Sequence, residues 1–177
     1  MGRKLLVNGT VYDGKGNEPV VADILIQDDK IAAIGENLDR DGADEVFNVS
    51  GLTVTPGFVD MHRHCDKSPF ETAKGENTYG KVMLRQGITT TATGNCGISM
   101  YPLSSDRAVV EEMRNYYAPV LGNIDAYGDI ATYEDYRKRL KECQLPVNTA
   151  AMIGMGAIRI AVKGFSEEPF TESEIKQ

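Results

Sequence analysis

The chain has 177 residues, of which 41% are hydrophobic and 25% are charged, and its net charge is −7 at pH 7. These proportions are those of an ordinary globular protein and exclude a disordered chain. The acidic balance offers no basic surface for nucleic acid or anionic membranes, and no run reaches the roughly 20 apolar residues of a membrane span. Neither nucleic acid nor a membrane is therefore expected as a partner.

The start of the chain and its cysteines predict a cytoplasmic protein. A polar Asn-Gly pair directly follows the apolar residues 5–7, which leaves no hydrophobic signal segment. An odd number of cysteines without such a signal indicates reduced thiols. The three cysteines are Cys65, Cys96 and Cys143.

Residues 1–55 predict a small β-sandwich of short strands and turns. The strands are expected at residues 5–7, 10–12, 22–26, 31–34, 46–49 and 52–55. Asn8 and Gly9 separate the first two strands, and this pair is typical of a two-residue hairpin turn because both positions favour positive φ. We therefore expect a hairpin at Asn8 and Gly9.

From residue 56 onward the pattern changes to alternating strands and helices. Apolar and β-branched runs predict strands, and apolar residues at helical spacing predict helices. The strands are expected at 58–61, 88–93 and 147–153, and the helices at 79–86, 106–121 and 133–143. This alternation predicts an α/β fold in which a parallel sheet is covered by helices.

The last residues predict the beginning of one more helix. Thr171 and Glu174 have the spacing of a capping box, in which each side chain accepts a hydrogen bond from the other residue's backbone N–H. The sequence ends at Gln177, one turn later, and short isolated helices are unstable in water. We therefore expect the chain to be an incomplete part of a larger fold.

The two histidines of the chain predict a metal site. His62 and His64 directly follow the apolar strand expected at 58–61, and residues two apart on a strand point to the same side. Two imidazoles so placed can share one metal ion, commonly zinc, iron or nickel. Two surface histidines on a loop are the alternative, which the preceding Pro-Gly-Phe-Val-Asp run disfavours. Asp66 either supports these histidines or is a solvated loop residue.

A cysteine after the second predicted strand of this region is the third candidate ligand. Cys96 lies between Gly94 and Gly97, whose backbone freedom permits a tight turn at the strand end. Free cysteines are usually buried packing residues, but thiolate is a soft ligand that favours zinc, and the nearby histidine pair favours ligation. Cys65 is expected to pack on the opposite face, and Cys143 to lie in the core or at the surface.

Three segments carry a resemblance to a known family. Residues 56–64 (PGFVDMHRH) resemble the first-strand motif of the amidohydrolase superfamily. Residues 87–99 (GITTTATGNCGIS) and 147–154 (VNTAAMIG) are similar to its D-aminoacylase branch, the N-acyl-D-amino-acid deacylases. The resemblance implies a small β-sandwich over 1–55, followed over 56–177 by the N-terminal part of a TIM (β/α)8 barrel. That barrel is incomplete, since a whole one takes roughly 250 residues.

The resemblance also implies a reaction, the zinc-assisted hydrolysis of the C–N amide bond of a small-molecule N-acyl-D-amino acid. In that branch the cysteine matching Cys96 binds zinc with later histidines, and the pair matching His62 and His64 forms a second, weaker metal position. One or two zinc ions are therefore expected. The later histidines and the aspartate that acts on the metal-bound water have no counterpart here, so the catalytic residue is not identified. Met155 stands where the family tends to carry a histidine.

Two other functions are consistent with these residues. One is a cyclic amide hydrolase such as a dihydroorotase or hydantoinase, although the glycine-framed Cys96 favours the deacylase. The other is a non-catalytic metal-binding fragment. Three barrel strands leave open sheet edges, which tend to recruit another chain. That chain would be a second copy, giving a homo-oligomer, or the missing C-terminal half.

Overall fold

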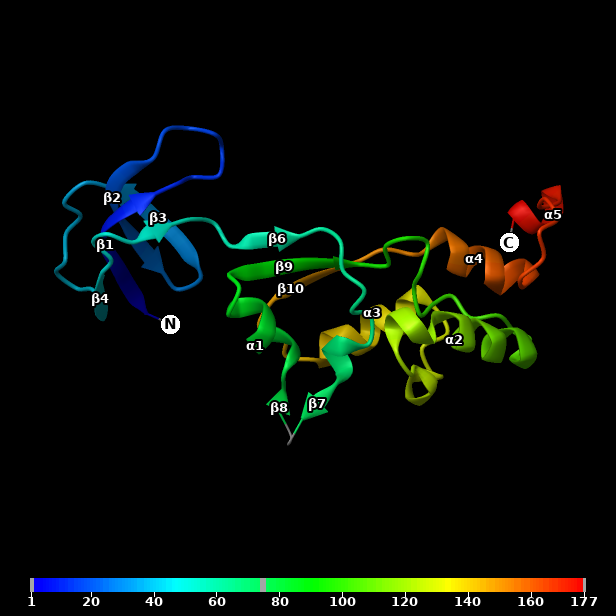
Figure 1. Cartoon of the computed structure of the whole chain (residues 1–177). Coiled ribbons are helices and arrows are strands. Elements are labelled where there is room, and N and C mark those ends of the chain that lie inside the picture. Colours follow the sequence, from blue (N-terminus) through cyan, green and yellow to red (C-terminus); the bar gives the residue numbers. More distant parts are fainter. Residues whose placement is uncertain (1, 74–75, 177) are drawn as a thin grey trace. The chain divides into compact units, whose positions relative to one another are not determined.

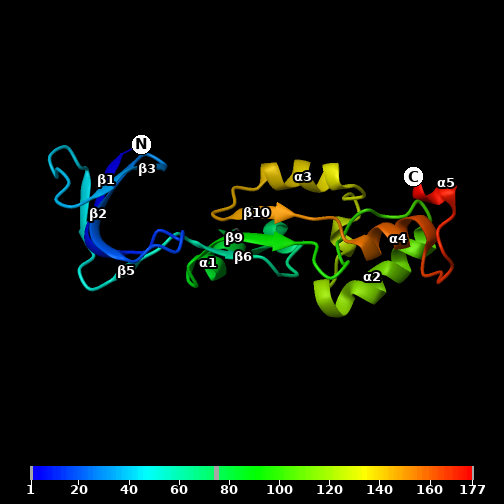
Figure 2. The same cartoon turned by 90° about the horizontal axis from the view of Figure 1, so that it is seen from above.

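A computed structural model of the chain describes residues 2–73 and 76–176. It divides into two compact units, Met1–Pro56 and Gly57–Gln177, which are described separately (Figures 1 and 2). Within the described ranges, no helix combines the length and the apolar character needed to cross a lipid bilayer.

The first unit is built on one mixed β-sheet. Its strands are β1 (Arg3–Val11), β2 (Val20–Gln27), β3 (Lys30–Gly35), β4 (Glu45–Asn48) and β5 (Thr53–Val54). The order is β3-β2-β1-β4, and β5 also pairs with β1. The neighbours β1, β2 and β3 are antiparallel, whereas β4 and β5 run parallel to β1. The described part of this unit contains this one sheet, so the sandwich stays a prediction.

The prediction of a hairpin at Asn8 and Gly9 is wrong. Strand β1 runs through both residues, and its pairing with β2 shifts register between Leu6 and Gly9. Asn8 has a φ of 64°, and its backbone N–H donates to Asp23 Oδ1 at 2.8 Å. The positive φ that this pair favours therefore serves a β-bulge inside one strand instead of a turn between two.

The second unit contains a three-stranded parallel sheet. Its strands are β6 (Phe58–Asp60), β9 (Ile88–Thr93) and β10 (Asn148–Ala151), in the order β10-β9-β6. Asp60 pairs with Thr91, and Ala151 pairs with Thr93. The carboxyl ends of all three strands therefore meet at one edge of the sheet, and the predicted parallel arrangement is confirmed.

Helices and short turns make up much of the rest of this unit. They are α1 (Tyr79–Leu84), α2 (Arg107–Leu121), α3 (Tyr133–Glu142), α4 (Met155–Lys163), α5 (Glu172–Ile175), and the 3-10 turns η1 (Ser68–Phe70) and η2 (Asp125–Tyr127), with a small ladder of β7 (Thr72–Ala73) and β8 (Glu76–Asn77). In Figure 1, α1 and α3 lie on the same side of the sheet. Helix α4 was not predicted, because Gly154 at its N-cap has no capping side chain.

A tyrosine-rich core holds the segment that follows β6. Tyr101, Tyr117 and Tyr136 are almost completely buried, together with Met113 of α2. The rings of Tyr101 and Tyr136 pack with their centroids 4.7 Å apart. The Tyr136 hydroxyl donates to the backbone carbonyl of Asp66 at 2.8 Å. This hydrogen bond ties the chain just beyond the two histidines to the core.

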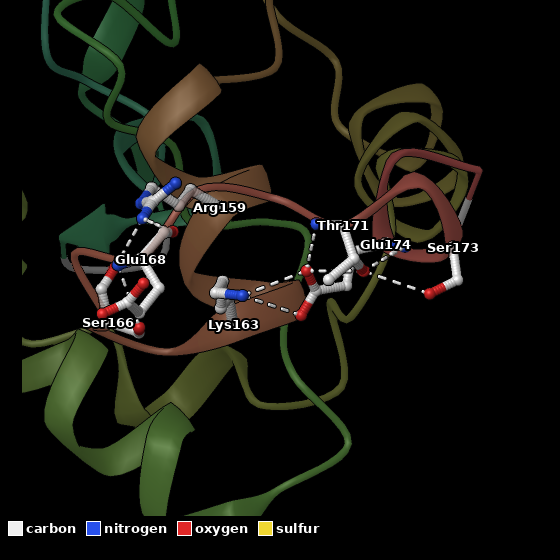
Figure 3. A network of polar contacts seen from close by, with 7 residues as sticks. All are labelled: Arg159, Lys163, Ser166, Glu168, Thr171, Ser173 and Glu174. Atoms are coloured by element: carbon white, nitrogen blue, oxygen red, sulfur yellow. Dashed lines mark hydrogen bonds and ion pairs between the residues drawn. The ribbon is translucent and has the colours of Figure 1, made fainter.

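The predicted capping box at the start of α5 is confirmed, and it also binds α4 (Figure 3). The Thr171 N–H donates to Glu174 Oε2 at 2.7 Å, and the Glu174 N–H donates to Thr171 Oγ1 at 3.3 Å. Lys163 of α4 forms an ion pair with Glu174 at 3.0 Å. The pKa of Glu174 is lowered to about 2, mainly by the hydrogen bond from the Thr171 N–H and then by Lys163 and the Thr171 hydroxyl.

We expect the link between α5 and α4 to survive in mildly acid solution. The pKa of Glu174 falls from 4.5 to about 2 in the folded protein. Its carboxylate therefore contributes stability that is present above pH 4.5 and is lost as the pH falls through about 2. An NMR titration of the Glu174 side chain measures this directly. Glu174→Gln should remove the pH dependence and Glu172→Gln should keep it, whereas a Glu174 midpoint near 4.5 would contradict the expectation.

Candidate metal centre

The segment that carries the two histidines is fastened at the end of β6. The His62 N–H donates to Asp60 Oδ1 at 3.2 Å, and Arg63 Nε donates to Asp60 Oδ2 at 2.7 Å. The Arg63 guanidinium lowers the pKa of Asp60 below its usual value. The Arg63 N–H also donates to the carbonyl of Ala92 on β9 at 3.2 Å. These bonds fix the direction in which the chain passes from His62 to His64.

The loop after β9 has an unusual backbone at Cys96. Gly94 and Gly97 have φ values of 85° and 75°, as their predicted role in a tight turn requires. Cys96 lies between them with a φ of 56°, a left-handed conformation that costs a residue with a side chain about 1–3 kcal/mol. Such conformations concentrate at functional sites, where the surrounding structure holds them in place.

Asn95 ties this loop to the histidine segment. Its Nδ2 donates to the carbonyl of Ala92 at 3.1 Å and to the carbonyl of Arg63 at 3.3 Å. The amide side chain therefore bridges the ends of two neighbouring strands. No sequence pattern indicates this role for Asn95.

The three residues predicted as ligands lie together at the carboxyl edge of the sheet. His62 Nε2 is 3.1 Å from Cys96 Sγ, and the ring centroids of His62 and His64 are 5.6 Å apart. One donor atom from each residue lies within 4.8 Å of the others, and in the part of the chain described here this is the group of three that could hold an ion. Nitrogen and sulfur ligands about 2.1 and 2.3 Å from one tetrahedral zinc lie roughly 3.5 Å apart. The nitrogen and sulfur donors, and the 3.1 Å spacing of His62 and Cys96, fit a shared zinc ion.

The other two cysteines lie outside this group. Cys65 is buried against Tyr79, Met83 and Val147, in agreement with the expectation that it packs, and burial raises the pKa of its thiol. Cys143 is half-buried at the end of α3, and burial raises the pKa of its thiol as well. Cys96, by contrast, is exposed.

A cavity of about 580 Å³ opens beside Cys96. Its walls include Ile160 of α4, Tyr116 of α2 and Phe165 of the following loop, so much of its lining is apolar. Edge-to-face packing brings the rings of Tyr116 and Phe165 to 5.3 Å between centroids. Arg159 of α4 also lines the cavity. The arrangement offers an apolar ligand a place next to the candidate metal centre.

Arg159 holds one wall of this cavity in place. Its Nη2 donates to the carbonyls of Ser166 at 2.6 Å and Glu168 at 2.7 Å (Figure 3). Its guanidinium also lies over the Phe170 ring, 5.0 Å from the centroid. The sequence analysis missed this residue, because α4 itself was not predicted. Met155 is the exposed first residue of that helix.

Comparison with known proteins gives a consistent result, although no family model matches the sequence. A D-aminoacylase from Alcaligenes xylosoxydans xylosoxydans is 36% identical over 173 residues, which is 97% of this chain and 33% of that protein. A solved D-aminoacylase structure, described as defining a novel subset of amidohydrolases, superposes with a TM-score of 0.73 and 32% identity over 98% of this chain and 34% of its own.

A second solved structure is an N-acyl-D-glutamate deacylase from Bordetella bronchiseptica in complex with zinc and a phosphonate inhibitor that mimics the tetrahedral intermediate. It has a TM-score of 0.72 and 28% identity, and the match covers 98% of this chain and 34% of that one. The chain spans about a third of the length of the curated relatives it matches. Sequence and structure together show that the chain is similar to about one third of these D-aminoacylases and N-acyl-D-amino-acid deacylases.

Proposed function

We propose that this chain supplies metal ligands to a zinc-dependent amidohydrolase that cleaves the C–N amide bond of N-acyl-D-amino acids. The observation that carries the proposal is the convergence of His62, His64 and Cys96, whose donor atoms lie within 4.8 Å of one another at the carboxyl edge of a parallel sheet. Active sites of barrel enzymes are built at that edge. Residues 1–55 would form the small sandwich, and residues 56–177 the first part of the barrel.

In this proposal the three side chains hold one or two zinc ions. Bound zinc supplies a Lewis acid that polarises the amide carbonyl and lowers the pKa of water from about 15.7 to about 7. The chain's own contribution is to hold the ligands in place, through Asp60 and Arg63 on one side and Asn95 on the other. The cavity beside Cys96 gives the apolar part of the substrate a place next to the metal.

The rest of the site comes from outside this chain. The chain matches about a third of a D-aminoacylase, so we expect it alone to bind metal without hydrolysing the substrate. Among the described residues β6 and β10 each pair with β9 alone, and Phe58 and Val59 of β6 are exposed. Open strands pair readily with further strands. We therefore expect the remaining barrel strands, or a second copy, to associate there.

The proposal is tested with a chimera in which this chain replaces the matching third of the Alcaligenes D-aminoacylase. We expect release of free amino acid from N-acetyl-D-amino acids and little from the L-enantiomers. A chelator should abolish it and zinc should restore it. His62→Ala in the chimera should lower its zinc content, because one ligand of the metal is lost.

Two results would count against this function. A folded, zinc-loaded chimera that hydrolyses no acylated amino acid would contradict it. Preferential cleavage of a hydantoin or of dihydroorotate would support the cyclic amide hydrolase instead. Circular dichroism and the zinc content of the purified chimera show whether it is folded and loaded.

A further inference from the structure

Two buried polar atoms beside the candidate metal centre make no hydrogen bond within the described residues. They are Nδ1 of His64 and Oδ1 of Asp66. Asp66 is fully buried, with 0% of its surface exposed. This excludes the alternative of a solvated loop residue. A buried polar atom without a partner is costly, and each such case in a native structure needs an explanation.

Another contact of Asp66 reaches the strand end from which the Cys96 loop begins. Its Oδ2 accepts a hydrogen bond from the hydroxyl of Thr93, the last residue of β9 and itself completely buried. Its backbone carbonyl accepts from Tyr136. Burial raises the pKa of the Asp66 carboxyl, and the Thr93 hydroxyl opposes this shift. Asp66 therefore lies two residues after His64 in the sequence. It is also hydrogen-bonded to Thr93, which lies three residues before Cys96.

We propose that Asp66 is the positioning residue of this metal centre, an inference that rests on the proposed zinc function. In the metal-bound protein its Oδ1 accepts the Nδ1–H of His64, so that His64 presents Nε2 to the ion. Its Oδ2, through Thr93, sets the position of the loop that carries Cys96. Metal-ligating histidines usually donate their second ring N–H to a carboxylate or carbonyl, which fixes both tautomer and ring orientation.

This role differs from a purely structural one in its effect on stability. Asp66→Asn keeps the size of the side chain and an oxygen that can accept from Thr93. The asparagine amide is neutral, so the substitution buries no charge. It also replaces the acceptor that His64 needs. Metal affinity should therefore fall while the melting temperature is kept, whereas a structural role would lower both together.

The experiment measures zinc affinity of the full 177-residue chain by competition with a chromogenic chelator. We expect Asp66→Asn to bind zinc about 10–100-fold more weakly than the unsubstituted chain. Cobalt(II) substituted for zinc should keep its thiolate charge-transfer band and show altered ligand-field bands, because Cys96 is untouched and His64 is not. Unchanged affinity in Asp66→Asn overturns the inference.

A second pair of variants tests the link through Thr93 and decides the matter if Asp66→Asn fails to fold. Thr93→Val removes the hydroxyl with little change in shape, and Thr93→Ser keeps it. Zinc binding should weaken in the valine variant and stay near normal in the serine variant, and equal binding by both overturns the link. An unsubstituted chain that binds no zinc would refute the proposed function as well. Zinc binding that depends on His62 and Cys96 but not on Asp66 would refute this inference alone.

Discussion

Cys96→Ser is expected to weaken zinc binding by the chain by roughly 100-fold or more. The Cys96 sulfur lies 3.1 Å from His62 Nε2, within the spacing of two ligands on one ion. Serine has nearly the same size, but its hydroxyl stays protonated and is a hard donor, whereas zinc prefers a thiolate. Calorimetry or chelator competition on the purified chain measures the loss.

The chain offers a matched control for this substitution. Cys143→Ser changes the half-buried thiol at the end of α3, where no candidate ligand lies, and should leave zinc affinity unchanged. Alkylation gives an independent readout, because Cys96 is exposed and bound zinc should slow its modification. Equal zinc affinities of Cys96→Ser and the unsubstituted chain would show that the sulfur is not a ligand.

Gly94→Ala is expected to destabilise the second unit by about 3 kcal/mol or more. Gly94 has a φ of 85°, and a left-handed backbone costs an alanine about 1–2 kcal/mol. An added Cβ would also lie 2.8 Å from the carbonyl carbon of Met152 and closer still to its oxygen. Those are backbone atoms of the chain leaving β10, so no side-chain rotation relieves the overlap. Zinc binding should fall too, because Cys96 is only two residues away.

Gly16→Ala separates the cost of the left-handed backbone from the cost of the steric overlap. Gly16 has the same φ of 85°, and a Cβ there would meet nothing within 4 Å. It should therefore lose only the backbone part, about 1–2 kcal/mol. Denaturant unfolding of both variants gives the comparison. Equal losses would show that the overlap with Met152 has no effect.

The parts of the fold that depend on local sequence could be predicted. Gly87 ends the segment of α1 with a φ of 74°, and the Thr171–Glu174 capping box begins α5 as expected. The failure at Asn8 and Gly9 has a non-local cause. Asn8 and Gly9 permit positive φ, but whether that makes a turn or a bulge depends on which strand lies alongside.

The ligands of the candidate site could also be predicted from the sequence, but their surroundings could not. His62, His64 and Cys96 could be singled out because their types and positions after strands point to metal chemistry. The surroundings could not, because they depend on contacts between distant segments. Aspartate is usually solvated, and only the packing around Thr93 and Tyr136 shows that Asp66 is buried.

Because His62 and Cys96 are far apart in sequence, an ion bound by both would also restrain the fold. These residues are 34 positions apart, so an ion shared by them would act as a cross-link between the ends of β6 and β9. Closing a loop of that size removes freedom from the unfolded chain worth up to about 4 kcal/mol for a permanent bond. Metal binding and the ordering of this sheet would then be one coupled equilibrium. Loss of the ion would loosen β6, the strand beside which further barrel strands are expected to pair.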